Sequence, residues 1–197
     1  MKKVICLLLT LCMVLALAAC GGSGNNAGKN SGGQDAGPAN SGDPIKVGVI
    51  NNDPNESGYR TANDKAMRDT FTADNGYEAT FYNNNDAAQQ IATAQQMIQD
   101  EVDFLLLSPA STTGWDTVLK DAQDAGTKVI LFDRMLDADD SMYAAAVVSD
   151  MPKEGETAVE WLASQGLSEY NIIHIQGHMG SDAQLGRTGA LDEKVNA

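Results

Sequence analysis

Short apolar segments alternate with longer segments of helical periodicity along most of this chain. The apolar segments are rich in Val, Ile, Leu and aromatic residues and are bounded by polar or turn-forming residues, which predicts strands. The predicted strands are residues 46–50, 78–82, 104–107, 128–132 and 143–148. The predicted helices between them are residues 59–74, 87–99 and 113–125. Strands separated by helices of this length are typical of βαβ units, so we expect an α/β fold with a doubly wound parallel sheet.

The alternation continues towards the C-terminus with fewer elements. A helix is predicted from about residue 152 or 153 to residue 165, because Pro152 suits a first helical turn and Gly166 suits a helix end. The elements predicted after it are a strand at residues 171–176, a loop at 177–180 and a helix at 181–196.

These last elements do not make a complete layer of structure. One strand and one helix cannot bury their own apolar faces, so Ile172, Ile173 and Ile175 would need further strands that this sequence does not contain. We therefore expect residues 45–166 to form a first lobe and residues 167–197 to form the start of an incomplete, apparently truncated second lobe.

The N-terminal residues 1–19 have the pattern of an export signal. Two lysines precede an apolar stretch at residues 4–18, which is too short to span a bilayer comfortably. The sequence Leu17-Ala18-Ala19-Cys20 resembles a bacterial lipobox, and the resemblance implies cleavage before Cys20, lipidation of this cysteine and anchoring in the membrane. A secreted protein without a lipid is the alternative.

Residues 20–44 are predicted to be a flexible tether. From residue 21 to residue 43 the chain is mainly Gly, Ser, Asn and Ala and has no apolar residue larger than Ala. Cys6 and Cys12 lie within the signal and Cys20 is the lipid acceptor, so the folded part has no thiol for a disulfide or a zinc site.

The charge of the chain narrows the range of partners. It carries 13 Lys and Arg against 27 Asp and Glu, a formal net charge of −14 at pH 7. Phosphate binding draws on clustered basic residues, which this sequence lacks, so nucleic acid is excluded as a partner.

Residues 137–140 lack the spacing of an EF-type calcium loop and are predicted to form a surface loop. His174 and His178 are expected to be structural, and we predict neither a metal nor a cofactor.

Polar clusters follow several of the predicted strands and indicate a ligand cleft. They are residues 51–60, 108–115, 133–134 and 177–187. In an open parallel sheet the ligand lies outside the carboxyl ends of the strands, so residues from distant segments converge there. Guanidinium and carboxylate groups hydrogen-bond hydroxyls in fixed directions and an aromatic ring covers C–H surface, which together favour a sugar.

Several short motifs carry a resemblance to a known family. They are Asn55-Glu56-Ser57-Gly58-Tyr59-Arg60-Thr61-Ala62-Asn63, Ser108-Pro109 with Gly114-Trp115, Phe132-Asp133-Arg134, Ser149-Asp150, and Gln176-Gly177 through Arg187. Together they resemble sugar-binding proteins of the periplasmic-binding-protein type I family. The first motif is most similar to the galactofuranose-binding branch of ABC sugar importers.

The resemblance assigns roles to residues of the first motif. It implies that Glu56 and Arg60 contact sugar hydroxyls and that Tyr59 stacks on the sugar ring. The galactofuranose-binding branch typically has Trp at the position of Tyr59, so the smaller aromatic face can change which ring form or isomer is preferred.

The other implied contacts come from later motifs. Asp133 and Arg134 resemble an Asp-Arg pair that grips adjacent hydroxyls through charge-assisted hydrogen bonds. Arg187 resembles the arginine that the second lobe contributes, and Ser108 is a weaker candidate for contact.

Each of these residues also has an ordinary structural interpretation. The alternatives are a surface ion pair between Arg60 and Asp133, a first-turn helix charge for Glu56 and a packing role for Tyr59. Their joint placement at strand ends favours ligand binding.

The resemblance implies a lipid-anchored, monomeric solute receptor on the outer face of the cytoplasmic membrane or in the periplasm. Two α/β lobes would close over one monosaccharide and deliver it to an ABC permease, with no chemical step. The alternatives are a sugar-sensing receptor for a membrane signalling protein and a secreted enzyme that uses Glu56 and Asp133 on a glycoside. The enzyme is less favoured because Arg134 beside Asp133 keeps that carboxyl ionised. The resembled family crosses between lobes three times, whereas we expect one crossing here, near residues 166–170.

Overall fold

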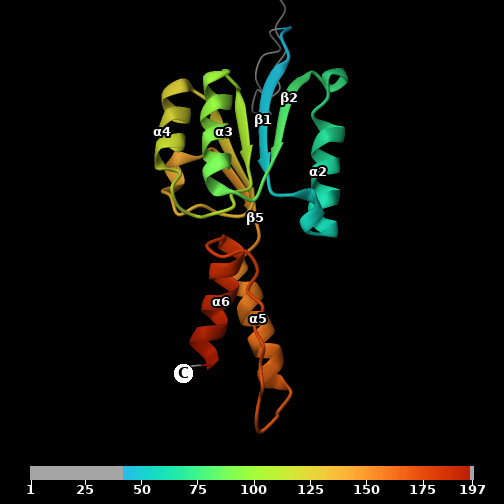
Figure 1. Ribbon diagram of the computed structural model, residues 1–197, viewed down its shortest axis with the longest axis vertical. Coiled ribbons are helices and arrows are strands. Elements are labelled where there is room, and N and C mark those ends of the chain that lie inside the picture. Colours follow the sequence, from blue (N-terminus) through green and yellow to red (C-terminus); the bar gives the residue numbers. More distant parts are fainter. Residues whose placement is uncertain (1–41, 196–197) are drawn as a thin grey trace, which may run out of the picture. The chain divides into compact units, whose positions relative to one another are not determined.

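The computed structural model describes residues 42–195 of the chain. Within this part of the chain, five strands form one sheet in the order β2-β1-β3-β4-β5 (Figure 1). They are β1 (Ile45–Asn51), β2 (Tyr77–Asn83), β3 (Phe104–Leu107), β4 (Lys128–Asp133) and β5 (Ala145–Val148). All neighbouring strands are parallel; for example, Val49 of β1 lies beside Phe81 of β2 and Leu106 of β3. The predicted α/β fold with a parallel sheet is confirmed.

Helices connect the strands, as the alternating pattern predicted. They are α2 (Gly58–Thr70), α3 (Ala87–Gln99) and α4 (Asp116–Ala125), with short 3-10 helices η1 (Pro54–Glu56), η2 (Ala73–Asn75) and η3 (Asp140–Met142). Helix α2 is shorter than predicted because Phe71 leaves the helical conformation, with φ −90° and ψ 71°. Residues 137–140, predicted to be a surface loop, are mostly exposed and run into η3.

The sheet has an apolar core on each face. Helices α3 and α4 cover one face and α2 lies against the other (Figure 1). Successive side chains of a strand point to opposite faces, so each strand contributes to both cores. The core under α3 and α4 includes Ile50, Leu105, Leu107, Val129 and Leu131. The core on the side of α2 includes Val47, Val49, Leu106 and Phe132, with Met67 and Phe71 packed against it. This doubly wound arrangement fixes the carboxyl ends of the strands at one edge.

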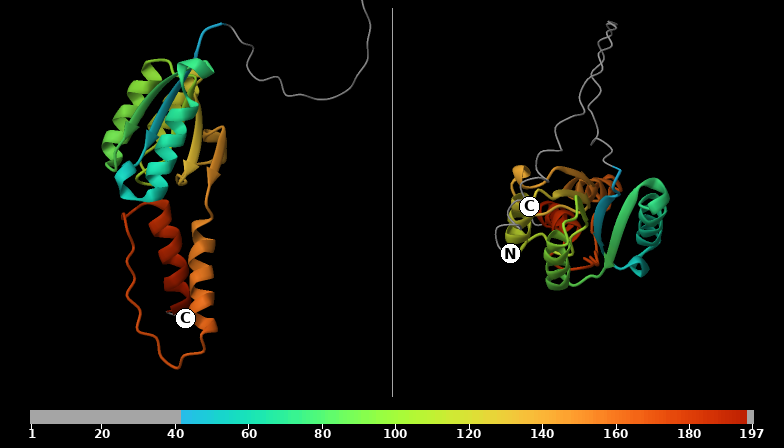
Figure 2. Two further views of the ribbon diagram at one scale, coloured as in Figure 1. Left: turned by 90° about the vertical axis from the view of Figure 1, so that its right-hand side faces the viewer. Right: turned by 90° about the horizontal axis from the view of Figure 1, so that it is seen from above.

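Two further helices follow the sheet and pack side by side (Figure 2). They are α5 (Met151–Ser164) and α6 (Asp182–Val195). Two glycines allow this close approach. A Cβ atom at Gly155 would lie 2.7 Å from the carbonyl oxygen of Arg187, and one at Gly186 would lie 2.7 Å from Cβ of Met151. Helix α5 therefore packs chiefly on α6.

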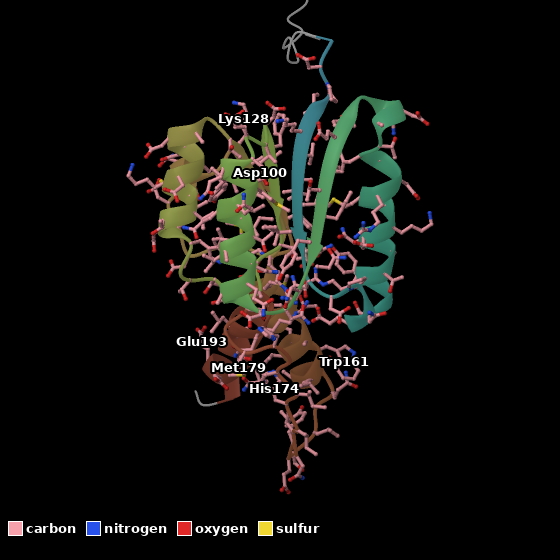
Figure 3. The ribbon with its side chains drawn as sticks, turned by 45° about the horizontal axis from the view of Figure 1, so that its top comes forward. Asp100, Lys128, Trp161, His174, Met179 and Glu193 are labelled. Carbon is pink, nitrogen blue, oxygen red and sulfur yellow. The ribbon has the colours of Figure 1, made fainter. Side chains whose placement is uncertain are left out.

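The prediction of a strand at residues 171–176 is wrong. This segment forms neither helix nor strand, and Ile173 is 92% exposed and Ile175 89% exposed. A strand requires a neighbour to pair its N–H and C=O groups, and no strand among residues 42–195 pairs with this segment. The apolar pattern suits a sheet, but the described residues supply no neighbouring strand for it. His174, expected within this strand, therefore lies in an irregular segment (Figure 3).

Several predictions fall outside the described residues. They are the signal at residues 1–19, lipidation of Cys20 and nearly all of the tether at residues 20–44. Across residues 42–195, no helix has the length and apolar character needed to cross a bilayer.

Candidate functional site

A cavity of about 600 Å³ lies at the carboxyl ends of the strands. Figure 3 shows many nitrogen and oxygen atoms gathered at that end of the sheet. The residues that line it are Glu56, Ser57, Tyr59, Arg60, Asp133, Arg134, Val147, Val148, Ser149, Met151, Ala183 and Arg187. The structure thus brings six of the seven predicted ligand-binding residues to one cavity.

The segment between β1 and α2 positions three of these side chains. Asp53 caps η1 by accepting a hydrogen bond from the backbone N–H of Asn55, and the hydroxyl of Ser57 caps α2 by accepting one from the N–H of Arg60. These caps satisfy N–H groups that a helix start leaves unpaired. Two successive helix starts therefore hold Glu56, Tyr59 and Arg60 at the cavity.

Arg60 and Asp133 form a buried ion pair. The Nη2 atom of Arg60 lies 2.6 Å from Oδ2 of Asp133, and the Arg60 side chain is only 4% exposed. Asp133 ends β4 with φ at +65°, a left-handed conformation that is unusual for a residue other than glycine. The ion pair between Arg60 and Asp133 that was considered as an alternative does form, but Arg60 is buried and not on the surface.

Arg134, next in the chain, is also buried and has several partners. Its Nη1 donates to Oδ1 of Asn52 at 3.2 Å, and its Nη2 lies 3.4 Å from Oε1 of Glu56. Its Nε lies 3.6 Å from Oδ2 of Asp133. Burial lowers the pKa of Arg134, and the positive charge of Arg60 lowers it further, while the two carboxylates oppose this change.

Glu56 joins the two arginines. Its Oε2 lies 3.4 Å from Nε of Arg60 and its Oε1 lies 3.4 Å from Nη2 of Arg134, and its side chain is 35% exposed. Two guanidinium groups and the carboxylates of Glu56 and Asp133 thus form one network of balanced charge. Such a network offers both donors and acceptors in fixed directions, which suits a neutral polyhydroxylated ligand.

Tyr59 presents its ring to the cavity. The residue is 54% exposed, and the guanidinium carbon of Arg60 lies 5.5 Å from the ring centroid. Partial desolvation raises the pKa of Tyr59, and the negative charge of Asp133 raises it further. A packing role would bury this ring in the core, so the exposed ring favours the interpretation as a ligand contact.

Ser108 lies beneath the cavity and does not line it. It is fully buried, and its hydroxyl accepts a hydrogen bond from Nη1 of Arg60 at 3.3 Å and donates one to Oδ2 of Asp133 at 3.2 Å. The structure therefore places Ser108 against two of the other predicted residues.

Arg187 reaches the cavity from α6. Its Nη2 and Nε lie 2.6 Å and 2.8 Å from Oε2 of Glu154 on α5, and half of its side chain is exposed. Met135 and Asp182 form another link between α6 and the strand ends, since the N–H of Met135 donates to Oδ2 of Asp182 at 3.0 Å.

Three residues at the site were not predicted from the sequence. Glu154 pairs with Arg187, while Asn52 and Gln90 are buried beneath the two arginines. A polar residue that directly follows a buried strand, or lies on the inward face of a helix, is the signal that could have found the last two. No group of three or more His, Cys, Asp or Glu among the described residues is arranged to hold a metal ion.

Comparison with known proteins identifies the family. Residues 47–197 match the family model described as "Periplasmic binding protein domain". The fructose import binding protein FruE of Bifidobacterium longum (strain NCC 2705) is 35% identical over 200 residues, covering 98% of this chain and 57% of FruE. The galactofuranose-binding protein YtfQ of Escherichia coli (strain K12) is 32% identical over 108 residues, covering 54% of this chain and 34% of YtfQ.

A solved structure shows the same fold. It is a protein from Mycobacterium smegmatis in complex with β-D-fucofuranose, with a TM-score of 0.68 and 30% identity over 77% of this chain and 51% of that chain. This chain therefore spans about half the length of FruE and of the M. smegmatis protein. The family predicted from the motifs is confirmed, and a galactofuranose-binding protein is among the relatives. Because the family model matches from β1 to the end of the sequence, the chain belongs to the periplasmic binding protein family.

Proposed function

We propose that this chain carries the sugar-recognition site of an extracytoplasmic binding protein that captures a monosaccharide and delivers it to an ABC importer. The observation that carries the proposal is the pair of buried arginines, Arg60 and Arg134, held with Glu56 and Asp133 at one cavity. The cavity volume of about 600 Å³ lies within the range of small-molecule sites.

The network supplies the contacts that a sugar needs. Arg60 and Arg134 donate charge-assisted hydrogen bonds to hydroxyl and ring oxygens, and Asp133 and Glu56 accept hydrogen bonds from hydroxyls. Tyr59 covers the C–H surface of the ring. Ser108 does not line the cavity but hydrogen-bonds to Arg60 and Asp133 and so holds them in place.

The two-lobe mechanism is supported by how α5 and α6 pack. Helix α5 packs on α6 and carries the partner of Arg187, so we place the boundary between lobes at Ser149 and Asp150, before the boundary at residue 166 that the sequence suggested. Arg187 would then contact the sugar from the second lobe. A ligand shifts a hinge towards closure only by binding the closed form more tightly, and Arg187 supplies part of that difference.

The relatives indicate the class of sugar. FruE is named for fructose, YtfQ for galactofuranose, and the M. smegmatis structure contains β-D-fucofuranose. We therefore take sugars that can adopt a five-membered ring as the substrate class. The relatives are named as binding proteins, which supports recognition without an enzymatic step.

The N-terminal sequence and the family support an extracytoplasmic location and a permease as partner. Lipidation of Cys20 would anchor a monomer on the outer face of the cytoplasmic membrane, within reach of the permease. Metabolic labelling with a fatty acid tests this part: the chain should incorporate label and the Cys20→Ser variant should not.

Calorimetric titration of the purified chain tests sugar recognition. Fructose, galactose, methyl galactofuranosides, arabinose and ribose are the ligands, and binding of at least one furanose-forming sugar is expected. Arg134→Ala should abolish this binding with the fold retained. Arg68→Ala is the matched control, because Arg68 on α2 is 48% exposed, pairs with Asp64 and lies over the Phe81 ring, and does not line the cavity. Absence of binding by the wild-type chain, or retention of binding by Arg134→Ala, would contradict the proposal.

A further inference from the structure

The arginines of the cavity rest on a layer of buried amide and hydroxyl groups, and Gln90 lies at its base. Gln90 is completely buried, and it does not line the cavity. We propose that Gln90 is a positioning residue, which sets sugar affinity by holding the ends of three neighbouring strands under Arg60 and Arg134. This inference rests on the proposed function, since it concerns the same cavity.

Gln90 bonds to the backbone after three strands. Its Nε2 donates to the carbonyl oxygen of Asn84 at 2.8 Å and lies 3.4 Å from the carbonyl oxygens of Asn51 and Ser108. Its Oε1 accepts from the N–H of Ala110 at 2.8 Å. Asn51 ends β1, Asn84 follows β2 and Ser108 follows β3, and these strands are adjacent in the sheet. One side chain of α3 thus ties together the carboxyl ends of β2, β1 and β3.

Two of the residues that Gln90 holds, Asn51 and Ser108, are partners of Arg60, and Ser108 also bonds to the partner of Arg134. Oδ1 of Asn51 and Oγ of Ser108 each accept from Nη1 of Arg60 at 3.3 Å. Asn52 donates to the carbonyl oxygen of Ser108 at 3.0 Å and accepts from Arg134 at 3.2 Å. Arg60 thus bonds to side chains whose backbone Gln90 holds, and Arg134 is linked to that backbone through Asn52.

An amide at this position is costly unless it serves an interaction. Burying an unpaired amide is unfavourable, and an apolar side chain in its place would leave the N–H of Ala110 and the carbonyl oxygen of Asn84 without this partner. Every polar atom of the Gln90 side chain has a partner in this layer. Fully satisfied buried networks restrict their members to one geometry, and a binding site that reads hydroxyl directions depends on such restriction.

The test compares three variants. Gln90→Met is close in shape and removes all the hydrogen bonds of the amide. Gln96→Met is the matched control, because Gln96 lies on the same helix, is exposed and bonds only to Asp100. Val118→Ala truncates a fully buried residue of the core under α4 and reports the effect of lost stability alone. Two quantities are measured: the sugar dissociation constant, and the ¹⁵N–¹H signals of the arginine Nε–H groups without sugar.

Gln90→Met is expected to weaken sugar binding about tenfold or more and to shift or broaden the Nε–H signals of Arg60 and Arg134. Gln96→Met and Val118→Ala should leave both readouts near those of the wild type. Should Gln90→Met fail to fold, Gln90→Glu is measured in the same way, since it keeps an acceptor for Ala110 and loses the amide donor.

The two readouts separate this inference from the proposed function. Unchanged arginine signals in the folded Gln90 variant would overturn the positioning role, and so would an equal loss of affinity in Val118→Ala. A wild-type chain that binds none of the sugars overturns the proposed function, while the arginine signals still decide the role of Gln90.

Discussion

The guanidinium group of Arg60 and the carboxylate of Asp133 lie 2.6 Å apart and join the first turn of α2 to the end of β4, across 73 positions of the chain. This pair connects two of the segments that line the cavity. Because the Arg60 side chain is almost completely buried, its positive charge depends on the carboxylates of Asp133 and Glu56 for compensation.

Asp133→Asn should destabilise the protein markedly. The substitution keeps a side chain that tolerates the left-handed backbone of Asp133 but leaves Arg60 without its shortest ionic partner. We expect the free energy of unfolding to fall by about 3 kcal/mol, measured by urea denaturation. Asp69→Asn is the control, because it removes an exposed partner of Lys65 on α2 and should leave the midpoint almost unchanged. Equal midpoints for the two variants would show that the Arg60–Asp133 pair is not important for stability.

Arg187→Gln should separate sugar affinity from stability. The Arg187–Glu154 pair is half exposed, so its loss should change the unfolding midpoint little. Sugar affinity should fall about tenfold, because one charge-assisted donor is lost from the cavity. Lys153→Gln removes a neighbouring charge of α5 that does not line the main cavity, and it should bind like the wild type. Normal affinity in Arg187→Gln would exclude Arg187 from the binding site.

Gly155→Ala should loosen the packing of α5 on α6. The added Cβ would lie 2.7 Å from the carbonyl oxygen of Arg187 and 2.8 Å from Cβ of Ala190, so the helices must move apart. We expect a loss of about 1–3 kcal/mol, seen as faster hydrogen exchange in both helices. Gly189→Ala, on α6 with open space around the new Cβ, should instead slow exchange slightly because alanine favours the helix. The same direction of change in both variants would contradict the packing described here.

Tyr59 should ionise at higher pH than a free tyrosine. Its pKa lies above 10.0, first because the side chain is partly desolvated and then because of the charge of Asp133. A raised pKa in the folded state means that this contribution to stability is complete below pH 10 and is lost as the pH rises through the pKa of the folded protein. The difference in absorbance at high pH between the wild type and Tyr59→Phe isolates this titration. In an Asp133→Asn background the Tyr59 titration should move to lower pH, and no movement would exclude Asp133 as a cause.

Much of the fold was predictable because its signals are local. The apolar segments of β1 to β5 and the helical periodicity of α3 lie within short stretches of sequence, and the structure agrees with them closely. The convergence of Glu56, Arg60, Asp133 and Arg134 was also predictable, since parallel strands place their carboxyl ends at one edge of the sheet. The irregular conformation of residues 171–176 was not predictable, because strand formation depends on a partner elsewhere in the chain.

The sequence by itself thus determined the α/β class, the order of the elements and the set of charged residues at the cavity. Only the tertiary structure decided how those residues are paired: Arg60 with Asp133, Arg187 with Glu154, and both buried arginines with the layer that Gln90 supports. The physical reason is the separation along the chain over which each interaction acts. Periodicity and capping act between residues a few positions apart, whereas ion pairs and buried hydrogen bonds join side chains that only the packing of α2, α3 and the strand ends brings within reach.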